Sequence, residues 1–310
     1  MNRFTLFFCV MIFCISCEKE PHFAGIEGIT FENYPKVDGS TSARALNQMV
    51  ACKLLGLRYE WMLSFSEEWS LTSEDIPKKY EDFLWERIKT SQTHGAFMNL
   101  IDGSVDIILT HRTVSPDEKA HADALGVTLI ETSIASDAFI FVVHPNNPVK
   151  SLTVGEIRKI YTNEITNWSE VGGNNAEIKV YTRPINSGSA EVFRTLVMDG
   201  LEAADFPFGI MINPMYGVFI AMMQDENGIC YTFNNYAEII ARRPDVSKIA
   251  INGILPNDNT VKDRTFPFIS EVCVAIRSDL SRNTMAFKLY GWLQSENAKS
   301  TLIECGFVPK

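Results

Sequence analysis

The sequence predicts an α/β protein in which helices cover parallel strands. Strand-like and helix-like segments alternate along the 310 residues, and this alternation is typical of parallel sheets with helices on their faces. The strand-like segments are continuous runs of Val, Ile and Phe, as expected where both faces of a sheet are buried. The length is sufficient for two α/β lobes or two domains.

Individual segments support this class. Runs rich in β-branched and aromatic residues predict strands at 104–110, 137–144, 177–182 and 271–276. Apolar residues at three- and four-residue intervals predict helices at 42–56, 152–162, 189–200 and 285–294. Residues 57–92 are more polar, and we expect them to form a helical excursion from the main fold.

The overall charge excludes one large class of partner. The formal net charge is −10, whereas a nucleic-acid backbone requires a basic face, so nucleic acid is not expected as a partner. Net acidity does not exclude a small anion, because helix dipoles and a single Arg can bind one inside an acidic protein.

The first 17 residues have the pattern of an export signal. Arg3 precedes an apolar run from Phe4 to Ile15 that is too short for a membrane anchor. Ser16 and Cys17 then precede a charged stretch, which resembles a bacterial lipoprotein signal with Cys17 as the lipidated residue. Cys14 stands where such signals usually have Leu, and a plain secretory signal is the alternative. Residues 18–30 are expected to be a tether.

Four further cysteines are widely spaced and lack C-x-x-C pairs, so a zinc site is not expected; they are Cys52, Cys230, Cys273 and Cys305. Export permits disulfides. Buried free thiols are the other interpretation, and the sequence leaves both open.

Hydroxyl-containing stretches stand at the starts of three expected helices, those at 42–56 and 189–200 and a short one at 97–101. The first is Ser40, Thr41 and Ser42, the second contains Thr93, and the third has Arg183 followed by Ser187, Gly188 and Ser189. Taken singly, each is explained as a helix cap. Hydroxyls and free N–H groups at helix starts also bind anions, and Arg183 adds a planar, charged fork suited to an oxyanion. Together the three stretches predict a site that holds an anion without reacting with it.

Longer motifs carry a resemblance to a known family. They include "YPKVDGSTSA", "GSVDIILTHRTVS", "VVHPNNPVKSLTVGEIRKIYTNEITNWSEVGG", "TRPINSGSAEVF" and "TFPFISEVCVAI". From about Tyr34 to Val308 the chain resembles the phosphate-binding proteins of ABC transporters, in the type 2 periplasmic-binding-protein fold. The resemblance implies two Rossmann-like lobes joined by hinge strands, with lobe 1 formed by 31–135 plus 248–310 and lobe 2 by 136–247.

The resemblance also implies which residues contact the ligand. It assigns the three stretches above to a tetrahedral oxyanion, and adds Thr110 and His111 after the strand at 104–110. Family members often place an Asp at the position of His111, where it accepts the proton of hydrogen phosphate. The substitution makes strict phosphate specificity an open question.

The function implied is capture of phosphate by an exported, monomeric lipoprotein that delivers it to an ABC permease and needs no cofactor or metal. One alternative is a receptor for another oxyanion or an anionic metabolite in sensing. A second is an exported hydrolase of phosphate esters, which the sequence disfavours. It contains no G-x-S-x-G elbow, no H-E-x-x-H motif and no P-loop.

Overall fold

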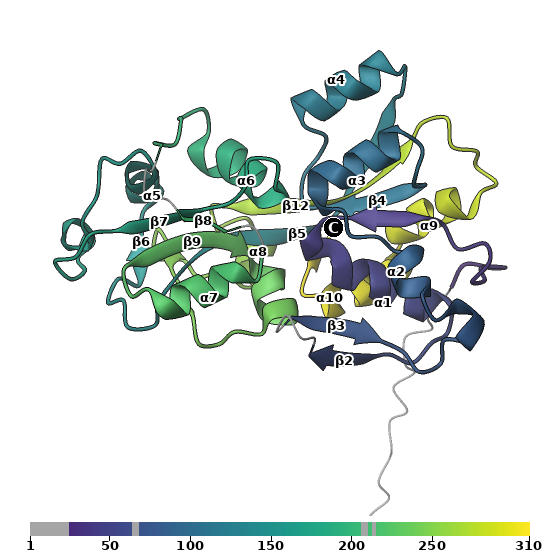
Figure 1. Ribbon diagram of the computed structural model, residues 1–310, viewed down its shortest axis with the longest axis horizontal. Helices are drawn as coiled ribbons and strands as arrows, with labels where there is room; N and C mark the ends of the chain where they lie inside the picture. The colour runs from purple at the N-terminus through teal and green to yellow at the C-terminus, as the bar shows by residue number, and fades with distance from the viewer. Residues whose placement is uncertain (1–24, 64–67, 206–209, 213–214) are drawn as a thin grey trace, which may run out of the picture.

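The computed structural model describes residues 25–63, 68–205, 210–212 and 215–310. Two α/β lobes lie side by side and share one long mixed sheet (Figure 1). Its strands follow the order β1-β4-β12-β5-β9-β7-β8, with β10 and β13 paired to β5. The prediction of an α/β fold with two lobes and connecting strands is confirmed. Among the described residues, no helix combines the length and apolar character needed to cross a membrane.

Lobe 1, on the right in Figure 1, holds one end of the sheet. Its strands are β1 (Val37–Gly39), β4 (Ile107–Thr110), β12 (Ile269–Arg277), β13 (Val308–Pro309) and the first part of β5 (Leu129–Val143). Its helices are α1 (Arg44–Leu54), α2 (Phe83–Glu86), α3 (Gln92–Ile101), α4 (Pro116–Ala124), α9 (Met285–Leu293) and α10 (Glu296–Glu304), with short 3-10 turns at Thr41–Ala43 and Lys78–Tyr80.

Lobe 2 contains the second part of β5 and the other end of the sheet. Its strands are β6 (Ser151–Leu152), β7 (Lys179–Thr182), β8 (Ile210–Met211), β9 (Gly228–Phe233), β10 (Ser247–Lys248) and β11 (Ala250–Ile251). Its helices are α5 (Val154–Tyr161), α6 (Gly188–Val192), α7 (Gly217–Gln224) and α8 (Asp258–Lys262), with a 3-10 turn η3 (Trp168–Val171) and π-helical segments η4 (Phe193–Met198) and η5 (Tyr236–Ala241).

Strand β5 passes from one lobe to the other. Residues 129–138 pair with β12 in lobe 1, and residues 139–143 pair with β9 in lobe 2, all antiparallel. The prediction of purely parallel sheets is therefore wrong for the centre of the molecule. Parallel pairing is retained on either side of the crossing, where β1 pairs with β4 and β7 pairs with β9 and β8.

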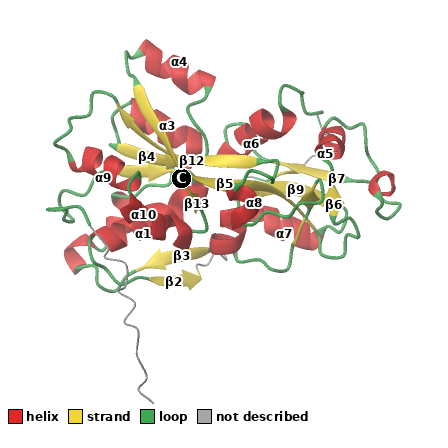
Figure 2. Ribbon diagram, turned by 180° about the vertical axis from the view of Figure 1, so that it is seen from behind, coloured by secondary structure: helices red, strands yellow, loops and turns green. Residues whose placement is uncertain are grey.

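Burial on both faces of the lobe 1 sheet explains its continuous apolar strands. Ile107 and Leu109 pack into the core under α1, α9 and α10, whereas Ile108 packs with residues of α3 on the other face. Figure 2 shows these helices on either side of the strands. Successive side chains of a strand point to opposite faces, so a two-sided core requires apolar residues at every position.

The return to lobe 1 comes later in the chain than the predicted boundary at 248. Ile251, Val261 and Phe266 belong to the lobe 2 core, and β11 pairs with β6. Lobe 1 resumes with β12. The described part of the predicted tether, residues 25–30, is attached to lobe 1, because Ile26 and Ile29 pack against its core.

The helical excursion predicted for residues 57–92 is wrong in its first half. Strands β2 (Glu60–Leu63) and β3 (Trp69–Thr72) pair antiparallel, and we call this pair the hairpin. The short helices come only afterwards. Strand β3 contacts η5 of lobe 2. The guanidinium of Arg242, the residue after η5, lies 4.8 Å from the ring centre of Trp61 and 4.5 Å from that of Trp69. This tertiary contact outweighs the weak local preference for helix.

The cysteines of the described residues are free thiols. Cys52, Cys230, Cys273 and Cys305 are all buried and unpaired. Burial raises the pKa of Cys52 and of Cys230 to about 12. Of the two interpretations left open by the sequence, the structure supports buried free thiols.

Candidate functional site

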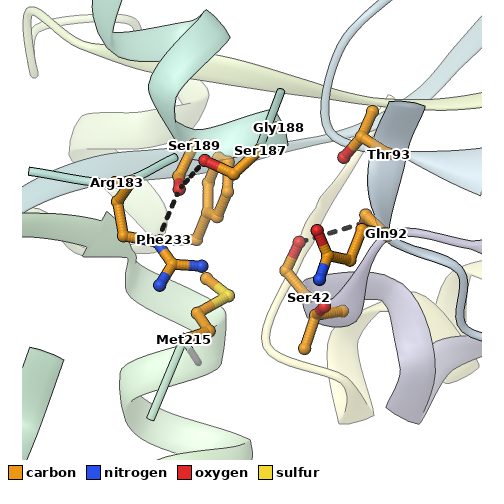
Figure 3. A pocket seen from close by; sticks show the side chains of 11 residues that line it. Ser42, Gln92, Thr93, Arg183, Ser187, Gly188, Ser189, Met215 and Phe233 are labelled. Atoms are coloured by element: carbon orange, nitrogen blue, oxygen red, sulfur yellow. Dashed lines mark hydrogen bonds between the residues drawn. The ribbon is translucent and has the colours of Figure 1, made fainter. Parts of the chain in front are cut away.

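The three hydroxyl-rich stretches meet at the cleft between the lobes (Figure 3). Each follows a strand or loop at the edge where β1 and β7 end, the edge at which open α/β sheets bind ligands. They surround a small cavity of about 20 Å³ that opens to solvent. Its described lining consists of Ser40, Thr41, Ser42, Gln92, Thr93, Arg183, Ser187, Gly188, Ser189, Met215 and Phe233. Eight of the ten ligand residues predicted from the sequence are in this set.

The first stretch is held close to the neighbouring strand. Ser40 caps the turn before α1, because its hydroxyl accepts a hydrogen bond from the Ala43 N–H. Its own N–H donates to the Leu109 carbonyl at 3.0 Å. Gly39 permits this approach, since a Cβ there would lie 2.5 Å from the same carbonyl oxygen. The cap and the glycine together fix where the Ser42 hydroxyl points.

Asp38 ties the first stretch to the second. Its carboxylate is fully buried and accepts hydrogen bonds from the Gly39 and Ser91 N–H groups and from the Asn99 side-chain amide. These bonds join β1 to the start of α3, the helix that carries Thr93. Because buried charge requires such compensation, Asp38 fixes the relative position of two ligand-binding segments without entering the cavity.

The third stretch supplies the only charged side chain among the described lining residues. Arg183 follows β7 and is 8% exposed. Its Nε donates to the Ser189 hydroxyl at 3.3 Å, and its Nη1 donates to the Ile212 carbonyl. Burial lowers the pKa of the guanidinium from its usual value, yet it remains protonated at neutral pH. Ser187 caps α6 through a bond from the Ala190 N–H.

The two lobes touch at the cavity. Thr93 belongs to lobe 1 and Gly188 to lobe 2, and a Cβ built on Gly188 would lie 2.1 Å from the Thr93 Oγ1. No side chain larger than hydrogen fits at position 188 in this arrangement. Donors from both lobes therefore face one space, as required for an anion held by both.

Comparison with known proteins agrees with this arrangement. The model of the PBP superfamily domain matches residues 60–287, most of the chain. The chain belongs to the PBP superfamily. Protein SphX of Synechococcus elongatus is 24% identical over 236 residues, which are 72% of this chain and 68% of that protein. Phosphate-binding protein PstS of Bacillus subtilis is 26% identical over 209 residues, 67% of this chain and 65% of the relative. The matches thus span about two thirds of these relatives.

Solved structures show the same fold. A Clostridium perfringens protein with bound phosphate has a TM-score of 0.67 at 22% identity. The match covers 88% of this chain and 98% of that protein. An ABC-type phosphate transport receptor from Vibrio cholerae has a TM-score of 0.63 at 22% identity. The match covers 88% of this chain and 99% of the receptor.

Three residues of this PBP-superfamily site were not predicted. Gln92 lines the cavity from the first position of α3 with a backbone φ of 62°, a value that is uncommon outside glycine and worth relating to function. Met215 and Phe233 contribute apolar surface. No sequence signal marks these two, because their proximity to the hydroxyls arises only from the folding of lobe 2.

The other two predicted ligand residues do not line the cavity. The Thr110 hydroxyl donates to the Arg112 carbonyl at 2.7 Å. Arg112 in turn forms a bidentate ion pair with the fully buried Glu118. It lines a second cavity between the lobes with His94 and Ser115 from lobe 1 and Asn186, Glu191 and Arg194 from lobe 2.

His111 lies behind Ser42, buried at the junction of the lobes. Its Nδ1 is 2.7 Å from the Ser42 hydroxyl oxygen, and its Nε2 is 3.5 Å from Oδ2 of Asp137 on β5. The ring packs on Phe233 and Phe307, with centroids 4.4 and 5.4 Å away. The structure thus gives no direct contact between His111 and the cavity, contrary to the prediction, and places it one hydrogen bond away.

Asp137 is also buried and is held by backbone groups. It accepts hydrogen bonds from the N–H groups of Ala138 and Asn235. Burial raises the pKa of its carboxyl, and the nearby His111 and these N–H groups act in the opposite direction.

The arrangement suits binding of a small oxyanion. The described lining offers hydroxyls, an amide and one guanidinium, and it contains no carboxylate that would repel an anion. In the described residues, no group of three or more His, Cys, Asp or Glu side chains is placed to hold a metal ion.

Proposed function

We propose that this protein is the solute-binding component of an ABC transporter and that it captures inorganic phosphate in the cavity between its lobes. The observation that carries the proposal is the convergence of Ser40–Ser42 and Thr93 from lobe 1 with Arg183 and Ser187–Ser189 from lobe 2 on one small cavity. A tetrahedral anion there receives donors from both lobes at once. Its binding therefore favours the closed state over any state with the lobes apart.

The names of the relatives support the choice of ligand. Both a Bacillus subtilis and a Borreliella burgdorferi relative are called phosphate-binding proteins. A binding protein needs only differential affinity for two conformations, and the site requires no bond-breaking step. Transport rather than catalysis is therefore the role that fits the family.

The proposal also covers where the protein acts and how it is attached to the membrane. The protein acts outside the cytoplasmic membrane, held there as a monomer by lipid on Cys17 and presenting its ligand to the permease. The support is the apolar run ending at Ser16 and Cys17. These residues lie outside the described part of the structure.

Calorimetry of the purified protein against phosphate, sulfate and common organic anions tests the proposal. Phosphate is expected to bind most tightly. A clear preference for a different anion would favour the second candidate, a receptor for another oxyanion, which the carboxylate-free lining also suits. Turnover of a generic phosphate ester would contradict both.

A further inference from the structure

One buried chain of polar groups leads from the cavity into the hinge. The Ser42 hydroxyl is hydrogen-bonded to His111 Nδ1 at 2.7 Å. On the other side of the ring, Nε2 lies 3.5 Å from Oδ2 of Asp137, close enough for an electrostatic interaction although no hydrogen bond is formed. All three residues are at most 2% exposed. Only Ser42 lines the cavity. Whether Ser42 donates to the ligand or accepts from it therefore depends on the proton positions in this chain.

The surroundings of the imidazole determine its proton positions. The groups packed around His111 are the Ser40 and Ser42 hydroxyls, the rings of Phe233 and Phe307, and the Asp137 carboxyl. Asp137 is the only ionisable group in this set. Because a carboxylate repels a ring-nitrogen lone pair, the neutral imidazole carries its hydrogen on Nε2, facing Asp137.

The position of the imidazole hydrogen determines how Nδ1 of His111 bonds to Ser42. With the hydrogen on Nε2, Nδ1 is an acceptor and receives a hydrogen bond from the Ser42 hydroxyl. Ser42 then has no hydrogen left for the ligand and presents a lone pair. The Ser40 hydroxyl, 3.1 Å away, is the other neighbour of the Ser42 oxygen. Ser40 can donate to one of the two lone pairs of this oxygen. An oxyanion bound beside Ser42 donates to the other only if it carries a proton of its own.

We propose that His111, oriented by Asp137, fixes Ser42 as a hydrogen-bond acceptor and so makes the cavity select a protonated oxyanion such as hydrogen phosphate over sulfate. His111 is thus a positioning residue that determines specificity without touching the ligand. This inference rests on the proposed function, since it concerns the ligand of the same cavity.

Two substitutions test the chain at different points. His111→Phe keeps a ring against Phe233 and Phe307 but removes the acceptor, which frees the Ser42 hydroxyl to donate. Asp137→Asn keeps the shape of the side chain. Its Oδ1 can still accept from Ala138 and Asn235, so its Nδ2 faces His111 and donates to Nε2. The imidazole hydrogen then moves to Nδ1, and Ser42 again becomes a donor.

The measurement is the ratio of phosphate to sulfate affinity by calorimetry at pH 7.5, for the wild type and each variant. Both substitutions should lower this ratio about tenfold or more, because a hydrogen bond to a charged group is gained for sulfate and one is lost for phosphate. His144→Phe is the matched control: His144 is a buried histidine of lobe 2 whose Nδ1 accepts from the Asn146 N–H, and the ratio should not change.

The outcomes separate the two proposals. A wild type that binds neither anion overturns the proposed function. A wild type that prefers phosphate while both variants keep its ratio within about twofold overturns only the role of His111. If His111→Phe does not fold, as judged by circular dichroism, the nearly isosteric Asp137→Asn decides alone.

Discussion

Gly188 of lobe 2 lies directly against Thr93 of lobe 1, so closely that a Cβ at position 188 would come within 2.1 Å of the threonine Oγ1 and 3.0 Å of its Cβ. Rotating the threonine side chain moves Oγ1 away but leaves the Cβ contact. The absence of a side chain at 188 is therefore what allows the lobes to approach to the distance described here.

Gly188→Ala should weaken phosphate binding by at least roughly tenfold, because overpacking a close contact costs about 1–3 kcal/mol. The melting temperature without ligand should change little, since the lobes can separate slightly to relieve the clash. Gly155→Ala is the control: Gly155 also lies in the first turn of a helix, and its added Cβ meets nothing closer than 3.9 Å. Equal affinities for the two variants would contradict the prediction.

Arg183→Ala should lower phosphate affinity by roughly 10- to 100-fold, because it removes a charge-assisted donor from a buried site. Arg183→Lys should restore only part of the loss, since an ammonium lacks the planar fork. Calorimetry provides the measurement. Arg158→Ala is the control, because Arg158 bonds to the Val197 carbonyl and Asp199 and does not line the cavity. An unchanged dissociation constant in Arg183→Ala would remove Arg183 from the site.

The contact between the hairpin and η5 should contribute to stability. Arg242→Ala removes a guanidinium that lies over both Trp61 and Trp69. We expect the free energy of unfolding in urea to fall by about 1 kcal/mol, the usual size for cation–π contacts near a surface. Arg282→Ala, where the guanidinium is exposed and 5.9 Å from the Phe287 ring, should have a smaller effect. Equal losses of unfolding free energy in the two variants would show that the contact of Arg242 with Trp61 and Trp69 is not stabilising.

Glu271 on β12 should make the free energy of unfolding depend on pH. Burial opposes its ionisation, but bonds from Lys310, Ser133 and Arg264 outweigh this and lower its pKa to about 2. A carboxyl with a lowered folded-state pKa stabilises the fold above its unfolded pKa, near 4.5, and loses this effect as pH falls toward 2. Glu271→Gln should therefore cost about 1 kcal/mol at pH 7, after allowance for solvent screening.

The deficit of Glu271→Gln should shrink between pH 4.5 and 2, as followed by urea unfolding at several pH values. Glu131→Gln provides a comparison of opposite sign, because burial raises the pKa of Glu131. Replacing it should cause no loss at pH 7. A deficit for Glu271→Gln that is the same at pH 7 and pH 3 would contradict the assignment.

Cys17→Ala should abolish lipid attachment and either release the protein from membranes or block its processing. Fractionation and mass spectrometry of the mature chain provide the measurement. Cys9→Ala, in the same apolar run, should leave attachment intact. A mature wild-type chain that begins elsewhere and carries no lipid would show that the segment is a plain secretory signal.

The sequence predicted the regular elements of the lobes well. The helices expected at 152–162 and 285–294 are found as α5 and α9, and the strand expected at 271–276 lies within β12. These segments succeed because local periodicity and burial favour the same structure. The pairing of β2 with β3 was missed, since both strands contact Arg242, which is far away in the sequence.

By itself, the sequence determined the α/β class and the three hydroxyl-rich helix starts, because caps and strand composition are local properties. It also determined that Arg183 accompanies the third helix start. Only the tertiary structure decided that Thr110 does not line the cavity and that His111 stands behind Ser42. Which way a side chain points at the end of a strand depends on the neighbouring strands. Here β5 and β9 bring Asp137 and Phe233 against the imidazole, and no local pattern around His111 specifies them.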